Sequence, residues 1–180
     1  MGIDFSLFSQ KAQAIAQQTY EVTLRYQHNQ ISREPVLLAC FGDANNDIYS
    51  LLEKLNVDVL CAKKRLESLV RYRLPSVPKK ELQLNKMTVS YQVKRFIEQT
   101  RIETDCLGEK IISSEILFLT LVRSYFSGPD ADRTLGEMLT SFGITPEVMR
   151  RTLLNKSFWR SPLINPHFSF VSWQSRNNLE

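Results

Sequence analysis

The sequence predicts an all-α protein in which two pseudo-twofold-related four-helix repeats pack as one eight-helix globule. Three observations lead to this prediction. Apolar residues recur at helical spacing, the chain has only 6 glycines and 7 prolines in 180 residues, and the pattern of the first half returns in the second. Turn-rich β-sandwiches need more glycine and proline. With 43% hydrophobic and 23% charged residues, the chain has the composition of a globular domain with a real core.

Two helices are expected at the start of the chain. In 9–27, apolar and small residues recur at i, i+3, i+4 and i+7 steps, which is one face of an amphipathic helix. Ser9 precedes this segment as its N-cap, because its hydroxyl can accept a hydrogen bond from a backbone N–H of the first turn. Residues 33–41 are apolar on nearly every side, which predicts a short, central, buried helix with Ser32 as its N-cap.

Two further helices complete the first unit. Leucines at helical spacing mark a helix over 48–55, and Asp58 caps a fourth that reaches residue 70. Cys40 and Cys61 fall within apolar helical patterns, so both are predicted to be reduced core thiols.

The second half of the chain repeats the first at an offset of 81 residues, as from Glu34 to Glu115. Eight of the thirty positions from 9 to 38 are then identical, where chance gives about two on ordinary amino-acid usage. After six extra residues the offset becomes 87 and aligns Ile48 with Leu135. The last helix is capped by Thr145, and Pro146 takes the favourable first position.

The repeat sets the expected domain organisation. Repeat one covers 8–70, a basic, proline-containing linker covers 71–87, and repeat two covers 88–154, all within one domain over 1–154. Each repeat alone is marginal in size, so the two are expected to share a core. The remaining 155–180 form a tail with several aromatic residues, which either packs back on the globule or docks on a partner.

Three stretches of repeat one carry a family resemblance. They are Phe8-Ser9-x-Lys11-Ala12, Asn29-Gln30-Ile31-Ser32-Arg33-Glu34-Pro35-Val36-Leu37-Leu38-Ala39 and Leu52-x-x-Leu55-Asn56-Val57-Asp58. Repeat two continues it with Ile112-Ser113-Ser114-Glu115-Ile116-Leu117-Phe118-Leu119 and Leu139-x-x-Phe142-Gly143-Ile144. Over residues 8–154 the chain resembles the Clp N-terminal repeat domain, which precedes the ATPase modules of the ClpA, ClpB, ClpC and ClpV unfoldases.

This resemblance implies a non-catalytic module that collects unfolded or tagged protein segments, or adaptor proteins, for an AAA+ ATPase ring in the same or another chain. It also implies a recognition surface made by one hydroxyl residue and one glutamate of each repeat, namely Ser9, Glu34, Ser90 and Glu115. An apolar groove between the repeats is expected to contribute. In the ClpC group the equivalent glutamates bind phosphorylated arginine.

The sequence departs from the family at positions that concern the ligand. Pro35 and Ile116 stand where the family has histidine, serine replaces threonine at positions 9 and 90, and the glycine-rich approach to the apolar helix is absent.

The residues also support simpler interpretations. Glu34 and Glu115 each fall in the first turn of a helix, where the helix dipole stabilises a carboxylate, and the serines serve as N-caps. A standalone all-α interaction or regulatory protein without a link to an unfoldase is the alternative function. A nucleic-acid-binding helical domain is less favoured, because the net charge is only +4 and acidic residues interrupt the basic clusters.

Several classes are excluded by what the sequence lacks. No G-x-x-x-x-G-K-[ST] motif and no C-x-x-C pair occur, and His28 and His167 have no partner at metal-ligand spacing. Neither an ATPase, another enzyme, a metal site nor a cofactor is therefore expected. No apolar run approaches the roughly 18 residues of a membrane span, and the first residues do not resemble a secretory signal, so the cytoplasm is the expected compartment.

Overall fold

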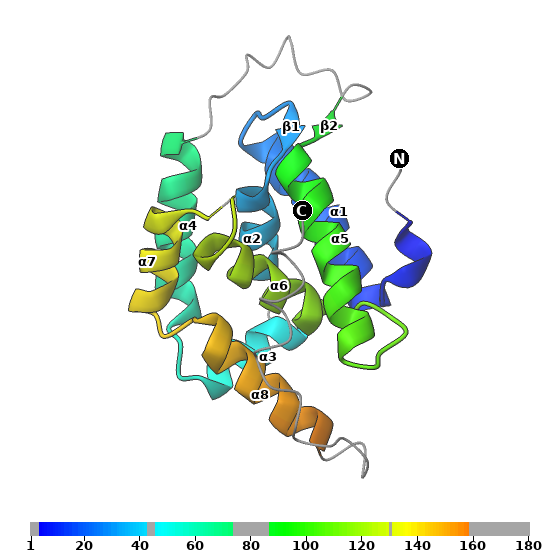
Figure 1. Ribbon diagram of the computed structural model, residues 1–180. Coiled ribbons are helices and arrows are strands. Elements are labelled where there is room, and N and C mark those ends of the chain that lie inside the picture. Colours follow the sequence, from blue (N-terminus) through cyan, green and yellow to red (C-terminus); the bar gives the residue numbers. More distant parts are fainter. Residues whose placement is uncertain (1–3, 43–45, 74–86, 130, 159–180) are drawn as a thin grey trace.

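The computed structural model describes residues 4–42, 46–73, 87–129 and 131–158. Within these ranges the chain forms eight α-helices and a short 3-10 helix at Phe5–Leu7 (Figure 1). Repeat one contains α1 (Gln10–Arg25), α2 (Arg33–Cys40), α3 (Asp47–Lys54) and α4 (Val59–Arg73). Repeat two contains α5 (Tyr91–Cys106), α6 (Ser114–Phe126), α7 (Arg133–Ser141) and α8 (Pro146–Phe158). The all-α prediction is confirmed.

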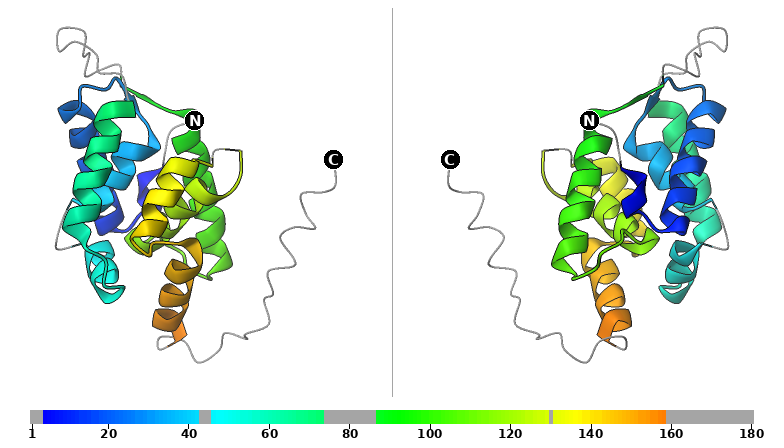
Figure 2. Two further views of the ribbon diagram at one scale, coloured as in Figure 1. Left: turned by 90° about the vertical axis from the view of Figure 1, so that its left-hand side faces the viewer. Right: turned by 90° about the vertical axis from the view of Figure 1, so that its right-hand side faces the viewer.

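The two repeats form the two halves of the molecule. In Figure 2, repeat one (blue to cyan-green) lies on one side and repeat two (green to orange) on the other. The helix α8 continues to Phe158, beyond the predicted end of repeat two at residue 154. The rest of the aromatic tail, 159–180, lies outside the described residues, as does most of the predicted linker.

The core is built around the second helix of each repeat. Every residue of α2 except Glu34 is buried, and α6 is similarly buried along its length. The rings of Phe41 and Phe118 meet edge to face at a centroid distance of 5.9 Å. Burial of one such large apolar side chain contributes about 1.5–3 kcal/mol. The described buried side chains of both repeats thus join one continuous core. The apolar groove expected between the repeats stays a prediction.

Most of the predicted N-caps are confirmed. The hydroxyls of Ser9, Ser90 and Ser113 each accept a hydrogen bond from the backbone N–H three residues later, at 3.2, 3.2 and 3.3 Å. Asp58 and Thr145 cap α4 and α8 in the same way. These bonds satisfy donors that a helix leaves unpaired in its first turn.

The predicted cap of α2 is wrong in its side-chain bond. Ser32 occupies the N-cap position, but its hydroxyl makes no capping hydrogen bond. The residue three positions later is Pro35, which has no backbone N–H to donate. The Ser32 Oγ atom is therefore buried without a hydrogen-bond partner among the described residues.

The helix ends also follow the repeat. After α1 and α5 the chain turns through Gln27 (φ 58°) and Gly108 (φ 71°), and after α3 and α7 through Asn56 (φ 54°) and Gly143 (φ 74°). At each end, two hydrogen bonds return to the last helical turn, as from His28 N to Thr23 O at 2.9 Å. This is the Schellman arrangement, which needs a left-handed residue. Equivalent positions thus adopt equivalent backbones even where only one of them is glycine.

Short parallel strands join the repeats, a feature that the helical pattern did not predict. Strand β1 (Gln30–Ile31) pairs with β2 (Thr88–Val89), with Gln30 opposite Thr88. A single parallel bridge, Phe8 with Ile112, forms the pseudo-equivalent contact. In both places, the segment that leads into the first helix of one repeat pairs with the segment that leads into the second helix of the other.

Of the two cysteines predicted to lie in the core, Cys40 is buried but Cys61 is exposed. The buried face of α4 is formed by Val59, Ala62, Leu66 and Val70. Cys61 is one position off this face, which is a rotation of about 100° around a helix. None of the helices in the described ranges is long and apolar enough to span a membrane.

Candidate functional site

The four predicted site residues all lie at helix N-termini. Ser9 and Ser90 cap α1 and α5, and Ser90 is only 4% exposed. Glu34 and Glu115 lie in the first turns of α2 and α6 and are half-buried. Ser9 is half-buried as well, but the hydroxyls of both serines are already used as caps.

The structure groups these residues across the repeats rather than within them. The Ser90 N–H donates to Ile31 O at 2.9 Å, which brings Ser90 to the segment that ends at Glu34. The Ser9 N–H donates to Ile112 O at 2.9 Å, which brings Ser9 to the segment that ends at Glu115. The resemblance took one serine and one glutamate from each repeat, whereas the backbone contacts bring the serine of one repeat to the glutamate segment of the other.

We name these two places by their glutamates. The Glu34 junction consists of 29–34 with 88–90, and the Glu115 junction consists of 112–115 with 7–9. Each contains backbone hydrogen bonds between the two repeats, two serines at N-cap positions and one half-buried carboxylate. Neither junction would exist in an isolated repeat.

The surroundings of Glu34 include two groups that the sequence did not single out together. His28 is 5% exposed, and burial lowers its pKa although the Glu34 carboxylate acts in the opposite direction. Its Nδ1 atom has no hydrogen-bond partner among the described residues. Tyr125 of α6 is fully buried, and its pKa is raised by burial and further by Glu34. Glu34 is thus close to both rings.

The side chain of Arg33, the residue before Glu34, extends into the interface between the repeats. Arg33 is 6% exposed, and its Nη1 atom donates to the backbone oxygen and the hydroxyl of Ser124 at 2.9 and 3.0 Å. Its guanidinium group lies 4.7 Å from the centroid of the Tyr125 ring, within the range of a cation–π contact. Arg33 therefore links α2 to α6.

The surroundings of Glu115 are different. Lys11, two residues after Ser9, forms an ion pair with Asp47 of α3 at 2.5 Å. The hydrogen bond that Lys11 donates to Asp47 raises the pKa of Lys11, and the nearby Glu115 carboxylate adds to this effect. The ammonium group is therefore paired with Asp47 and lies near Glu115. The Glu115 Oε2 atom also accepts a hydrogen bond from Ser114 Oγ at 3.3 Å.

Exposed apolar side chains border both junctions. Tyr91, next to Ser90, is 74% exposed, and Ile111, next to Ile112, is 54% exposed. Phe5 is also exposed and lies in contact with the Phe8 ring at a centroid distance of 5.5 Å. Carboxylates beside exposed apolar groups suit the binding of a protein segment better than they suit catalysis.

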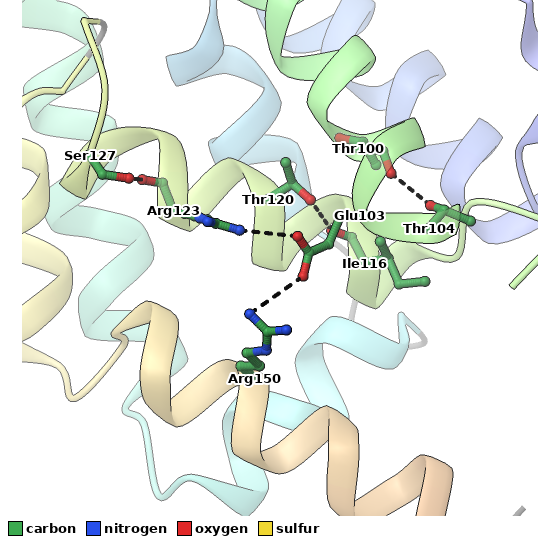
Figure 3. A network of polar contacts seen from close by, with 8 residues as sticks. All are labelled: Thr100, Glu103, Thr104, Ile116, Thr120, Arg123, Ser127 and Arg150. Atoms are coloured by element: carbon green, nitrogen blue, oxygen red, sulfur yellow. Dashed lines mark hydrogen bonds and ion pairs between the residues drawn. The ribbon is translucent and has the colours of Figure 1, made fainter. Parts of the chain in front are cut away.

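A second polar cluster has a structural rather than a binding geometry. Glu103 of α5 lies between Arg123 of α6, at 3.0 Å, and Arg150 of α8, at 4.0 Å (Figure 3). The Glu103 side chain is only 13% exposed, so its carboxylate is enclosed by the two arginines. The cluster holds three helices of repeat two together.

The described residues contain no group of three or more His, Cys, Asp or Glu that could hold a metal ion. Among the cysteines, burial raises the pKa of Cys40, which favours the unreactive thiol form.

Comparisons with known proteins agree with this architecture. The model of the Clp repeat (R) N-terminal domain family matches residues 7–128. A search of the curated proteins found no match. The fold is similar to the N-terminal domain of the chaperone ClpD from Arabidopsis thaliana, with 16% identity, a TM-score of 0.60 and coverage of 86% of this chain and 97% of that chain.

Two other solved structures have the same fold. The N-domain of ClpV from Vibrio cholerae is 16% identical, with a TM-score of 0.63 and coverage of 85% of this chain and 89% of that one. A protein from structural investigations of a malarial protein secretion system is 16% identical, with a TM-score of 0.69 and coverage of 83% and 94%.

Proposed function

The chain belongs to the Clp repeat (R) N-terminal domain family, and on this premise we propose that it is a non-catalytic docking module for an ATP-dependent unfoldase. It binds unfolded or tagged protein segments, or adaptor proteins, and presents them to an AAA+ ATPase ring in the same or another chain. The cytoplasm is the compartment proposed for this activity.

The observation that carries the proposal is the pair of junctions. Each places a half-buried glutamate at a helix N-terminus, next to backbone from the other repeat and beside exposed apolar side chains. A carboxylate beside exposed apolar groups fits an extended segment that has both cationic and apolar side chains. The proposed contacts are made by Glu34 and Glu115, while Ser9 and Ser90 position the backbone of each junction.

Weak binding at such junctions suits delivery to a translocation machine. A client must be released after it has been collected, so a single tight site would work against transfer. Several weak sites on a ring gain affinity through a high effective concentration, without new contacts. Two junctions on one module are the smallest version of this arrangement.

The test is binding of a permanently unfolded protein, such as reduced and carboxymethylated α-lactalbumin, to the 180-residue chain. We expect weak, saturable binding that falls about tenfold in the double variant Glu34→Ala/Glu115→Ala, because hydrogen bonds to a charged group are lost. Glu98→Ala, at an exposed position on α5, is the matched control and should bind like the wild type. Equal binding by all three proteins, with circular dichroism unchanged, would remove the site assignment.

A further inference from the structure

We propose that the outward side of α4 is a second docking surface, which binds an acidic amphipathic helix of another protein. We name it the α4 face, and it consists of the exposed residues on one side of this helix: Leu60, Cys61, Lys64, Arg65, Ser68, Arg71 and Tyr72. It shares no residue with either junction, so this inference goes beyond the proposed function and does not rest on it.

The α4 face is opposite the side of the helix that joins the core. The helix lies on the outside of the molecule (Figure 1) and packs against α2 and α3. Its buried residues are Val59, Ala62, Leu66 and Val70. With a rotation of about 100° per residue, the residues of the α4 face fall within an arc of about 140°. They therefore form one continuous stripe along about 18 Å of helix.

The positive charge of the chain is concentrated in α4. The helix contains 5 of the 23 basic residues and only 1 of the 19 acidic residues, so the rest of the chain has 18 of each sign. The single acidic residue, Glu67, is half-buried and follows the buried Leu66. The α4 face itself carries Lys64, Arg65 and Arg71 without a carboxylate. A stripe of one sign at the surface selects partners of the opposite sign.

Folding gives no reason for the two cations in the second turn of α4. Within the described residues, neither Lys64 nor Arg65 forms an ion pair. The helix dipole favours cations in the last turn of a helix rather than near its start. By contrast, the guanidinium group of Arg71, near the end of α4, lies 5.6 Å from the centroid of the Tyr26 ring. The charges of Lys64 and Arg65 are thus presented to solvent.

The equivalent helix of repeat two does not carry this pattern. The offset of 87 places Glu147 at the position of Leu60 and Thr152 at the position of Arg65. Both helices are capped by the side chain that precedes them, and both pack against the second helix of their repeat. Because the shared backbone does not require the stripe, the α4 face is particular to repeat one.

The occupant has to come from another chain. The two long segments outside the described residues are basic: 74–86 contain three lysines and one glutamate, and 159–180 contain two arginines and one glutamate. Neither can supply several carboxylates to the α4 face.

A helix suits the shape of this surface. Two helices can pack side by side with their axes about 8–10 Å apart, whereas the outward side of one helix offers no edge to an extended strand. Leu60, which is 61% exposed, and Tyr72, which is 92% exposed, lie at the two ends of the stripe. The matching helix therefore has carboxylates between two apolar residues.

Two other anionic partners fit the α4 face less well. Single-stranded nucleic acid is bound through several aromatic side chains that stack on bases, and Tyr72 is the one aromatic residue of the stripe. A helix that binds a membrane surface inserts its apolar side into the lipid, but the apolar side of α4 is buried in the core.

The test uses the 15N-labelled chain and an acetylated and amidated peptide, Ala-Leu-Ala-Gln-Glu-Glu-Ala-Gln-Glu-Ala-Ala-Gln-Leu-Ala-Gln. When this peptide is helical, its glutamates lie between two leucines on one side. A second peptide has glutamine in place of every glutamate. We expect saturable shifts of the Lys64 and Ser68 amide signals and none at Ile31 or Ile112. The glutamine peptide should bind about tenfold more weakly, because three exposed charge pairs contribute about twofold each.

Variants of the α4 face identify the groups that bind. Lys64→Gln/Arg65→Gln should weaken binding of the glutamate peptide about fourfold, because two charge pairs are lost. Leu60→Gln should weaken it about threefold, because an apolar contact at one end is lost. Arg151→Gln, at the position of α8 equivalent to Lys64 and exposed like it, is the matched control and should bind like the wild type. Amide spectra confirm that each variant retains the fold.

Three results would overturn the proposal. They are equal binding of the two peptides, unchanged binding by Lys64→Gln/Arg65→Gln, and tighter binding of oligothymidylate or phosphatidylserine vesicles than of the glutamate peptide at the same amides. The outcome is separable from the proposed function. If the glutamate peptide binds the α4 face while binding of unfolded α-lactalbumin does not depend on Glu34 and Glu115, the junctions fail as a site and the α4 face stands. In the reverse case, the junctions stand and the α4 face fails.

Discussion

Exchanging glycine and non-glycine residues between equivalent helix ends tests how strictly the two repeats share one backbone. Gln27 ends α1 at φ 58°, and its equivalent, Gly108, ends α5 at φ 71°. A non-glycine residue has a conformational free energy about 1–2 kcal/mol higher in the left-handed region. Glycine loses more conformational freedom on folding, which returns about 0.4–1 kcal/mol of this difference. Gln27→Gly should therefore stabilise the chain by about 0.5–1 kcal/mol.

The reverse change, Gly108→Ala, should destabilise the chain, and here only the backbone preference changes. A Cβ atom added to Gly108 meets nothing within 4 Å, so Gly108→Ala changes only the backbone preference. We expect a loss of about 0.5–1 kcal/mol from the same two terms, and each 1 kcal/mol shifts the melting temperature of a domain of this size by about 2–4 °C.

The assay is urea unfolding followed by circular dichroism, with melting temperature as a second measure. Gln27 is half-buried, so Gln27→Ala is needed as a control: it keeps the left-handed strain and removes only the side-chain contacts. The free energy of unfolding of Gln27→Gly should exceed that of Gln27→Ala by the net backbone difference of about 0.5–1 kcal/mol. If Gln27→Gly is less stable than Gln27→Ala, or Gly108→Ala is neutral, the argument from equivalent helix ends is refuted.

Three further predictions concern buried polar groups. Glu103→Gln should cost about 1–2 kcal/mol, because hydrogen bonds to the charged group are lost from a nearly buried carboxylate, and Glu98→Gln, at an exposed position on the same helix, should cost almost nothing in urea unfolding. Burial lowers the pKa of His28 from 6.5, so the unfolded chain binds the proton first and the free energy of unfolding should fall as the pH drops below about 6.5. His28→Gln should reduce this loss between pH 7.5 and 5. A pH profile unchanged by the substitution would contradict the prediction. A thiol-specific chromogenic reagent should titrate two thiols in the native chain and the third, that of the buried Cys40, only after unfolding; three reactive thiols in the native state would be inconsistent with the core.

The helices and the repeat were predictable because their signals are local. Apolar spacing, cap residues and the offset of Glu34 from Glu115 all lie within short windows of sequence, and their consistency across two copies strengthened each of them. The error at Cys61 was avoidable: Ala62 and Leu66, at i and i+4, already define the buried face of α4.

The junctions were not predictable in the same way. Strands of two residues carry no periodicity, so nothing in 30–31 or 88–89 distinguishes them from loop. Which serine meets which glutamate depends on how the repeats are placed relative to each other, and that placement is set by the shared core rather than by chain order. The resemblance named Ser9 and Glu34 within one repeat, whereas the backbone pairing brings Ser90 to the segment that ends at Glu34.

Internal symmetry separates the residues that build the fold from those that give each half its own chemistry. Where the copies agree, as at Thr19 and Thr100, whose buried hydroxyls both donate to the carbonyl four residues earlier at 2.8 Å, the shared residue serves packing that both halves need. Where they disagree at one structural position, the backbone gives no reason for the difference. Lys11 against Gln92 and Pro35 against Ile116 are such positions, and each of the four residues lies within two residues of a junction.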